Sequence, residues 1–393
     1  MKVVLTGATG FVGGAVARRL AAEGADVHAL ALPSSDRTRL AGCPVSFHTG
    51  DITDPAGLAG LFDGARWVIH AAGMLGRFGV SEATYTRINA EGVGHVLAAV
   101  ERAWKQGRTA ADLRVLHVSS AGVLGPVRVT SEDVVSGQWS VVSEEVVSGQ
   151  WSVVSEEVVS GQWSVVSEEV TSDELRTTSG APLDSSLVTR RSSLDETSPL
   201  APSNAYERSK ALGEEVAAGY ARDGLPLVVA RPEFIYGPGD THVLGLFRAI
   251  RRGMFFYIGD GTNTCHPTYV DDMVDGLLAC LRQGAPGAVY HIAGPRPLPF
   301  RELAETIAAE LGAPSPRLRV PVPLAWLGAA GLEAAGTLLG RDVPLSRTGV
   351  AFFSESRRST YARAERELGF RPQVDLREGV ARTVAWYRAE GLI

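Results

Sequence analysis

A glycine-rich turn joins the first apolar run of the chain to its first helical segment. The run KVVLTG ends at Gly7, Gly10 and Gly13 follow at three-residue spacing, and a helical pattern then continues to Gly24. A pyrophosphate needs such a turn, because side chains would keep it from the backbone N–H groups where a helix begins and its dipole favours negative charge. A plain tight turn is the alternative. The position between a strand and a helix predicts a dinucleotide site at Gly7, Thr9, Gly10, Phe11, Val12 and Gly13.

Apolar runs and helix-period segments alternate along the first 124 residues. We expect strands at 2–7, 26–32, 45–51, 65–73 and 113–120, and helices at 11–24, 54–64 and 86–107. This alternation predicts an α/β fold: a Rossmann-type, doubly wound parallel sheet covered on both faces. The last third of the chain predicts a smaller, mainly helical C-terminal substrate domain, with helices at 300–312, 363–370 and 376–391.

A repeat-containing segment interrupts this pattern between residues 126 and 195. The twelve-residue unit SEEVVSGQWSVV occurs twice without change, with diverged copies on both sides, over residues 131–170. The even period keeps each residue type on one face of a strand, and paired valines with Ser-Gly turns favour hairpins over helix. We therefore predict a β-rich or disordered insertion that takes no part in the chemistry. A lid or a subunit contact is the alternative.

The α/β pattern resumes after the insertion with a helix at 205–224 and a strand at 225–232. We predict a dinucleotide-binding Rossmann domain over residues 1–230, interrupted by the insertion at 126–195. Residues 231–393 would then form the substrate-binding domain, with a strand near 289–294 that returns to the Rossmann sheet.

Asp51 and Ile52 follow the third expected strand and suit the adenine of a dinucleotide. A carboxylate can accept from the exocyclic amine while Ile packs on the ring; a plain turn with a helix cap is the alternative. An acid at the end of the second strand would favour NAD, and an Arg there would favour NADP. Ala31 and Leu32 occupy those places. The cofactor is therefore predicted to be NAD or NADP, with NAD slightly favoured.

Tyr206 and Lys210 lie four residues apart on the expected helix, so both project from one face. A phenol near pKa 10 is a poor base at neutral pH, and a cation one turn away favours its ionised form. Ser120 ends the fifth expected strand and could hold a substrate oxygen beside the Tyr hydroxyl. Two exposed helix residues are the alternative for Tyr206 and Lys210. Together with the glycine turn, the three residues predict general acid–base catalysis.

Eight motifs together resemble the extended short-chain dehydrogenases/reductases, in the NAD-dependent epimerase/dehydratase family: TGATGFVG, GDITDP, VIHAAG, INAEG, VSSAGVLG, YERSK, RPEFIYGPGD and HPTYVDD. The resemblance covers the whole chain except about 126–195. It implies that Tyr206 is the general acid/base and that Ser120 orients the substrate. It also implies that Lys210 lowers the pKa of Tyr206 and bonds the nicotinamide ribose. It further implies that the cofactor is lined by Ala71, Ala72, Gly73 and Pro232, and that Asn89 supports Lys210 through water.

Two departures from the nucleotide-sugar members of the family bear on the substrate. Phe234 stands where those members carry an Asn, and Cys265-His266-Pro267 replaces an Arg-Asp that meets the diphosphate. The pattern is more similar to hydroxysteroid dehydrogenases and dihydroflavonol reductases. We predict an NAD(P)-dependent alcohol–ketone oxidoreductase acting on a small, apolar substrate of steroid, terpenoid or lipid type. A sugar-nucleotide epimerase or dehydratase and a non-enzymatic nucleotide sensor are the alternatives, and His266 is interpreted as structural rather than substrate-binding.

Composition sets limits on partners and location. The net charge of −6 gives no basic footprint, so no nucleic-acid partner is expected. Cys43, Cys265 and Cys280 are scattered, which predicts neither a disulfide framework nor a metal site.

The apolar stretch 323–340 is short for a bilayer span and predicts a helix lining an apolar pocket, with a membrane-surface contact as the alternative. No signal-peptide pattern precedes the first strand. We expect a cytoplasmic protein without a transmembrane segment, and family members commonly form homodimers through a helix pair.

Overall fold

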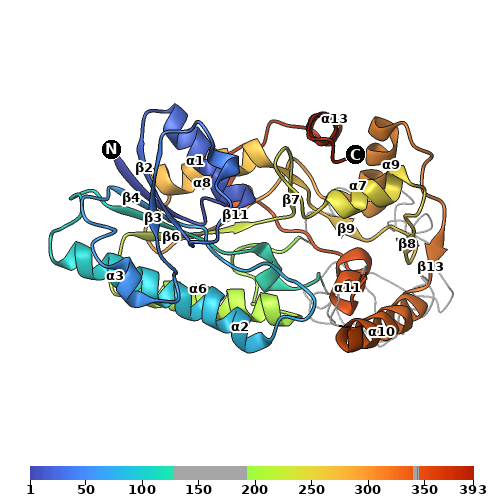
Figure 1. Ribbon diagram of the computed structural model, residues 1–393, viewed down its shortest axis with the longest axis horizontal. Coiled ribbons are helices and arrows are strands. Elements are labelled where there is room, and N and C mark those ends of the chain that lie inside the picture. The colour runs from blue at the N-terminus through green and yellow to red at the C-terminus, as the bar shows by residue number, and fades with distance from the viewer. Residues whose placement is uncertain (128–192, 340–342, 344) are drawn as a thin grey trace, which may run out of the picture. The chain divides into compact units, whose positions relative to one another are not determined.

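A seven-stranded parallel sheet organises the computed structural model, which describes residues 1–127, 193–339, 343 and 345–393 (Figure 1). The strand order is β11-β6-β5-β4-β1-β2-β3. The strands are β1 (Lys2–Thr6), β2 (Asp26–Ala31), β3 (Val45–Thr49), β4 (Trp67–His70), β5 (Arg114–Val118), β6 (Leu227–Pro232) and β11 (Val289–Ile292). The order reverses between β1 and β4, which is the switch point where doubly wound sheets bind ligands. The predicted Rossmann-type α/β fold is confirmed.

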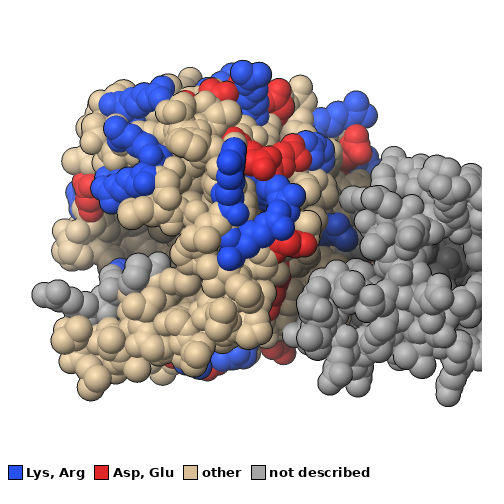
Figure 2. Space-filling model, turned by 90° about the vertical axis from the view of Figure 1, so that its right-hand side faces the viewer, with Lys and Arg blue, Asp and Glu red and all other residues tan. Residues whose placement is uncertain are grey.

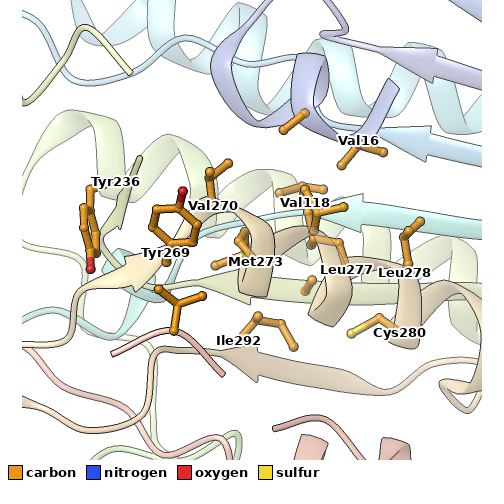
Figure 3. Close-up of a cluster of buried hydrophobic side chains, with 14 of the residues drawn as sticks. Val16, Val118, Tyr236, Tyr269, Val270, Met273, Leu277, Leu278, Cys280 and Ile292 are labelled. Atoms are coloured by element: carbon orange, nitrogen blue, oxygen red, sulfur yellow. The ribbon is translucent and has the colours of Figure 1, made fainter. Parts of the chain in front are cut away.

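Helices cover both faces of the sheet, as strands with mostly buried residues require. On one face lie α1 (Phe11–Ala22) and α8 (Val270–Gln283), joined by an Arg19–Asp275 ion pair (Figure 1). Figure 3 shows side chains of this layer, among them Val16, Met273 and Leu277, packed on the sheet. On the other face lie α3 (Gly92–Lys105) and α6 (Ala205–Arg222), packed against a second apolar cluster.

The region from 54 to 64 differs from the expected helix. Only the short 3-10 turn η2 (Pro55–Leu58) forms there, capped by the side chain of Asp54. Gly60 and Gly64 follow with φ of +71° and +73°. Such left-handed residues end helices rather than continue them. The expected helix at 86–107 is present as three consecutive segments: α2 (Glu82–Thr86), the π-helical turn η3 (Arg87–Glu91) and α3.

The C-terminal region is mainly helical, as expected. Its helices are α7 (Leu244–Arg251), α9 (Phe300–Leu311), α10 (Val322–Leu339), α11 (Arg347–Ser354), α12 (Ala362–Leu368) and α13 (Leu376–Ala389). Short strand pairs connect them: β7 (Ile235–Tyr236) with β10 (Thr268–Tyr269), β8 (Tyr257–Ile258) with β13 (Arg319–Val320), and β9 (Thr264–Cys265) with β12 (Leu298–Pro299). The strand β11 pairs with β6 in the main sheet. The domain boundary at 230 stays a prediction.

The chain divides into two compact units, residues 1–126 with 194–393 and residues 127–193. Within the first unit, the two ends that flank the second are tied together. The amide of Ala201 donates at 3.0 Å to the carbonyl of Val123, which lies in the short 3-10 helix η4 (Ala121–Leu124). The predicted β-rich or disordered character of the repeats at 131–170 falls outside the described residues.

The apolar stretch 323–340 forms α10, yet this helix is mostly exposed. Its buried residues are Ala325, Ala329 and Gly336. By length and composition α10 could cross a membrane, although only 17% of its 18 residues are buried in the protein. This differs from the expected pocket-lining helix. The physical reason is that α10 presents small residues, rather than its leucines, to the rest of the protein.

Candidate active site

The glycine turn after β1 leaves open the backbone at the start of α1. Gly7 has a φ of +80°, and a Cβ there would lie 2.6 Å from the carbonyl carbon of Ala71. A Cβ on Gly13 would overlap the Gly7 carbonyl oxygen. The helix begins after Gly10 with no side-chain cap and no acidic residue in its first turn. The first N–H groups of α1 are therefore open to an anion, which fits the pyrophosphate of a dinucleotide.

The other predicted residues of the turn surround this opening. Thr9, Phe11 and Val12 are partly exposed beside the exposed Gly10. A second glycine loop approaches from β7: a Cβ on Gly239 would lie 3.6 Å from the Phe11 ring. The approach of this loop to Phe11 was not predicted, although the GPGD sequence after β7 is a signal for a turn.

Asn89 fixes the loop that follows β4 and contains Ala71, Ala72 and Gly73. Its Oδ1 accepts from the Met74 N–H at 2.8 Å, and its Nδ2 donates to the Met74 carbonyl and to Ser209 Oγ, each at 3.0 Å. Asn89 lies in the π-helical turn η3, a distortion that is frequent at functional sites. Its buried amide thus joins the loop to α6 through the residue before Lys210. The water-mediated support of Lys210 stays a prediction.

Asp51 and Ile52 follow β3, at the carboxyl end of the same parallel sheet. The Asp51 carboxylate accepts from the Thr53 N–H at 2.8 Å and remains partly exposed. The Ile52 side chain is 8% exposed and packs toward Gly92 of α3, whose Cβ would lie 2.9 Å from it. The turn interpretation thus describes the local bonding of Asp51, and contact of both residues with adenine stays a prediction.

Ser120 and Tyr206 meet across 86 positions of sequence. Ser120 follows β5 and caps η4, with its Oγ accepting from the Gly122 N–H at 3.1 Å. Tyr206 stands in the first turn of α6, which Asn204 caps by accepting from the Glu207 N–H at 3.0 Å. Burial raises the pKa of the Tyr206 phenol, and a side-chain hydrogen bond with Ser120 lowers it in part. The phenol therefore keeps its proton at neutral pH in this state of the protein.

Lys210 lies one helical turn after Tyr206, and its side chain is buried. Its Nζ donates to the Val118 carbonyl at 2.9 Å. Burial lowers the pKa of Lys210 to about 8, against the opposing effect of the Glu214 carboxylate. A Cβ on Gly73 would lie 3.8 Å from Nζ, so the ammonium stands beneath the loop after β4. The three predicted catalytic residues are thus brought to the carboxyl end of the sheet, next to the glycine turn.

A buried polar network supports this region and was missed in the sequence. The Glu214 carboxylate, one turn after Lys210, accepts from Ser119 Oγ at 2.8 Å and from Arg231 Nε at 3.0 Å. Arg231 lies 3.3 Å from His291 Nε2 through its Nη1. An Arg inside the buried strand LVVARP was the available signal, because a buried cation requires a partner. The network connects α6 with β5, β6 and β11.

Carboxylates also hold an arginine beside Glu207, the residue that follows Tyr206. Arg357, between α11 and α12, pairs with Glu207, and its Nη2 lies 3.0 Å from a Glu355 carboxylate oxygen. Glu207 accepts in addition from the Ser203 N–H at 2.7 Å. The Arg357 guanidinium is therefore neutralised by protein groups. Sequence reasoning missed this pair, because the two partners lie 150 positions apart.

Aromatic rings pack together at the segment that follows β6. The Phe234 ring meets Phe352 edge-on at 5.6 Å between centroids, and Phe352 meets Phe353 at 5.2 Å. Pro232, which ends β6, is buried beside Ile292, and its contact with a cofactor stays a prediction. The segment that would carry polar groups in a nucleotide-sugar enzyme is thus lined by phenyl rings.

His266 links two backbone segments. Its Nδ1 lies 3.0 Å from the Ser359 carbonyl oxygen and its Nε2 lies 2.9 Å from that of Gly294. Burial lowers its pKa to about 4. Each ring nitrogen faces a backbone carbonyl oxygen, and the neutral ring donates its one N–H to one of the two. A buried ring held between backbone groups is the arrangement of a structural histidine. Among the described residues, no group of His, Cys, Asp and Glu could hold a metal ion.

Comparison with known proteins gives one family and two kinds of relative. The model of the NAD dependent epimerase/dehydratase family matches residues 3–143 and 180–293. A 3beta-hydroxysteroid-dehydrogenase/decarboxylase of Arabidopsis thaliana is 33% identical over 212 residues, 48% of this chain and 47% of that protein. A dTDP-glucose 4,6-dehydratase of Actinoplanes sp. is 32% identical over 196 residues, 49% of this chain and 53% of that protein. The chain spans about half the length of these curated relatives.

Solved structures share the fold of the described residues. A dTDP-glucose 4,6-dehydratase from Streptomyces venezuelae, with NAD and TYD bound, superposes with a TM-score of 0.67 at 25% identity, covering 100% of both chains. A UDP-glucuronic acid 4-epimerase from Bacillus cereus in complex with NAD reaches a TM-score of 0.64 at 18% identity, covering 99% of both, which is a likeness of fold alone.

Proposed function

Since the chain belongs to the NAD-dependent epimerase/dehydratase family, we propose that it is an oxidoreductase interconverting an alcohol and a ketone on a small, apolar substrate. The proposed cofactor is NAD, held at the glycine turn, the loop after β4 and Asp51. A substrate of steroid, terpenoid or lipid type agrees with relatives named as hydroxysteroid and sterol dehydrogenases.

One observation carries the choice of substrate class: polar groups suited to a diphosphate are replaced or already paired. Phe234 packs on Phe352, and Arg357 is held by Glu207 and Glu355. A diphosphate would have to compete with these carboxylates for the guanidinium and would face phenyl rings in place of an amide. An apolar ring system instead gains by burial against the same surface.

The catalytic side chains suit proton transfer at the substrate oxygen. When bound, the nicotinamide supplies or accepts the hydride. Because its pKa is raised, Tyr206 holds a proton that it can donate to a ketone oxygen, and it takes the proton back when an alcohol is oxidised. Ser120, hydrogen-bonded to the same phenol, orients that oxygen. The ammonium of Lys210 favours the phenolate left after donation.

Dehydration of a nucleotide sugar is the second candidate, supported by the relatives and solved structures named as dTDP-glucose dehydratases. Eliminating water needs an additional acid to protonate the departing hydroxyl. The residues directly after Ser120 are the apolar stretch AGVL of η4, and the nearby Glu207 is paired with Arg357. These neighbours favour simple oxidoreduction.

The test measures net formation of NADH or NADPH at 340 nm over sterol-like alcohols and nucleotide sugars, with Tyr206→Phe as the variant. We expect NADH formation with a sterol-like alcohol, and a loss of about 10²- to 10⁴-fold in the variant. Tyr220→Phe, a tyrosine farther along the same helix, is the matched control and should leave turnover unchanged. Turnover that survives Tyr206→Phe would refute the mechanism. Conversion of a nucleotide sugar without net NADH would favour the second candidate.

A Phe234→Asn variant separates the substrate classes. The change restores the amide found in nucleotide-sugar enzymes and removes the ring that packs on Phe352. We expect KM for the sterol-like alcohol to rise and NAD binding to stay unchanged. An unchanged KM would contradict the role of Phe234 in substrate choice. A homodimer and a cytoplasmic location stay predictions.

A further inference from the structure

The exposed side of α10 is apolar around more than half of its circumference. Its leucines stand out into solvent, with exposed fractions of 60% at Leu324, 73% at Leu327, 86% at Leu338 and 70% at Leu339. At 100° per residue these positions, together with the half-exposed Trp326, span a far wider arc than the stripe that one packed helix covers. The lower part of the surface that is not drawn in grey in Figure 2 carries few charged side chains.

The carboxylate and the hydroxyl of α10 are both paired within the protein. Glu333, its single charged residue, accepts from the Arg347 N–H at 2.8 Å and pairs with the Arg347 Nε at 2.7 Å. Thr337 donates its hydroxyl to the Glu333 carbonyl at 2.8 Å. The charge therefore faces α11, and the outward face carries no charged side chain that would have to leave water on entering an apolar medium. The exposed Trp326 has an apolar ring with one N–H donor, which suits the boundary between lipid and water.

Two arginines precede the helix. Arg317 and Arg319 are exposed on both sides of Leu318, which is itself 63% exposed. Within the described part of the chain, neither arginine forms an ion pair with an acidic residue. A segment with basic residues beside exposed leucines and a tryptophan is typical of a surface that meets anionic lipid head groups.

We propose that the α10 face, defined as Leu318 with the exposed side of Val322–Leu339, docks on a lipid bilayer surface that contains anionic lipids. A fluid bilayer can cover this wide arc, whereas a partner helix from a second copy covers a narrow stripe. The helix lies in the interface and does not cross it. Its inner side is fixed by Ala325 and Ala329 against Ile258 and Val350, and 18 residues span about 27 Å, slightly less than the hydrocarbon core.

The test uses the full chain in flotation with vesicles, one set of phosphatidylcholine alone and one of an equal mixture with phosphatidylglycerol. It is read without cofactor or substrate, so its result is independent of the proposed activity. We expect the protein to float with the mixed vesicles. A Leu327→Glu/Leu338→Glu variant should bind at least about tenfold less, because it places two charges in the apolar layer. An Arg317→Gln/Arg319→Gln variant should lose the preference for the mixed vesicles.

Matched controls separate docking from loss of folding. A Leu200→Glu/Leu212→Glu variant makes the same change at leucines that are 42% and 44% exposed elsewhere, and it should float as the unmodified protein does. All variants should keep their circular dichroism and thermal midpoint, since the positions are exposed. Absence of flotation of the unmodified protein, or equal flotation of the Leu327→Glu/Leu338→Glu variant, overturns the proposal. A dimer in sedimentation that this variant dissociates, without vesicle binding, assigns the face to a second copy instead.

Discussion

Replacing Lys210 with Met should abolish activity and yet stabilise the folded protein near neutral pH. Burial lowers the pKa of Lys210 from 10.5 to about 8, so the folded protein holds the ammonium at a cost. The difference of about 2.5 between the two pKa values, at about 1.4 kcal/mol each, corresponds to about 3 kcal/mol. Met also leaves the Val118 carbonyl without its donor, which costs about 1 kcal/mol. The variant should therefore be about 2 kcal/mol more stable.

The sign of this effect depends on pH. Below pH 8 both folded and unfolded chains bind the proton, so the full cost falls on the folded state. Between pH 8 and 10.5 the folded protein releases the proton while the unfolded chain keeps it, and the stability of the unmodified protein rises. Above that range neither state carries the charge. The stability advantage of Lys210→Met should thus shrink as pH rises through this window. Above the window the variant should be less stable than the unmodified protein, by the roughly 1 kcal/mol of the lost hydrogen bond to Val118.

Urea unfolding of the cofactor-free proteins, below pH 8 and near pH 10, measures the difference. Lys105→Met is the matched control, because Lys105 is exposed and its hydrogen bond with Glu101 raises its pKa. We expect that this variant is not more stable than the unmodified protein at any pH. A Lys210→Met variant that is less stable than the unmodified protein at pH 7, or whose advantage does not change with pH, would refute the reasoning. An activity assay alone cannot test this reasoning, because the Lys210→Met variant is expected to be inactive whether it is more stable or less stable than the unmodified protein.

Three further changes test other parts of the structure. Gly7→Ala forces a side chain into a φ of +80° and against the loop after β4, and it should lower stability by at least about 2 kcal/mol and weaken NAD binding, as thermal unfolding and fluorescence titration would show. Arg231→Leu leaves the Glu214 charge buried without its partner and should cost about 3–5 kcal/mol in urea unfolding; adding Glu214→Leu should recover most of this loss. Replacing residues 127–193 with a short Gly/Ser linker should leave the thermal midpoint and NAD binding unchanged. A lower midpoint or a loss of NAD binding would contradict the prediction that the insertion takes no part in the chemistry.

Features that depend on neighbours in sequence were accessible before the structure. The glycine turn between β1 and α1 follows from three-residue spacing, and the shared face of Tyr206 and Lys210 follows from the helical period. The approach of Ser120 to Tyr206 required one further assumption, that parallel strands end at the same edge of the sheet. The catalytic and cofactor-binding roles of these residues still await the experiments above.

Features that depend on distant partners were not accessible. The pairing of Arg231 with Glu214 and of Arg357 with Glu207 joins residues that no local pattern connects. The expected helix at 54–64 is wrong for a local reason: its apolar spacing is helical, but its glycines adopt left-handed backbone angles that a helix excludes. The exposure of α10 was also hidden, because an all-apolar helix has the same sequence whether it is covered or not.

The edge strand β11 limits how this protein can be divided or recombined. Val289–Ile292 pairs with β6, so the sheet that begins the chain is completed by a strand that follows α7 and α8 and precedes the other C-terminal helices. A fragment ending at residue 230 would expose the backbone of β6 as a new hydrogen-bonding edge, which invites aggregation. Exchange of the substrate-binding portion between relatives therefore has to preserve this returning strand. The nucleotide-binding sheet and the substrate-binding portion alternate along the chain, so neither can be exchanged as one continuous segment without the other.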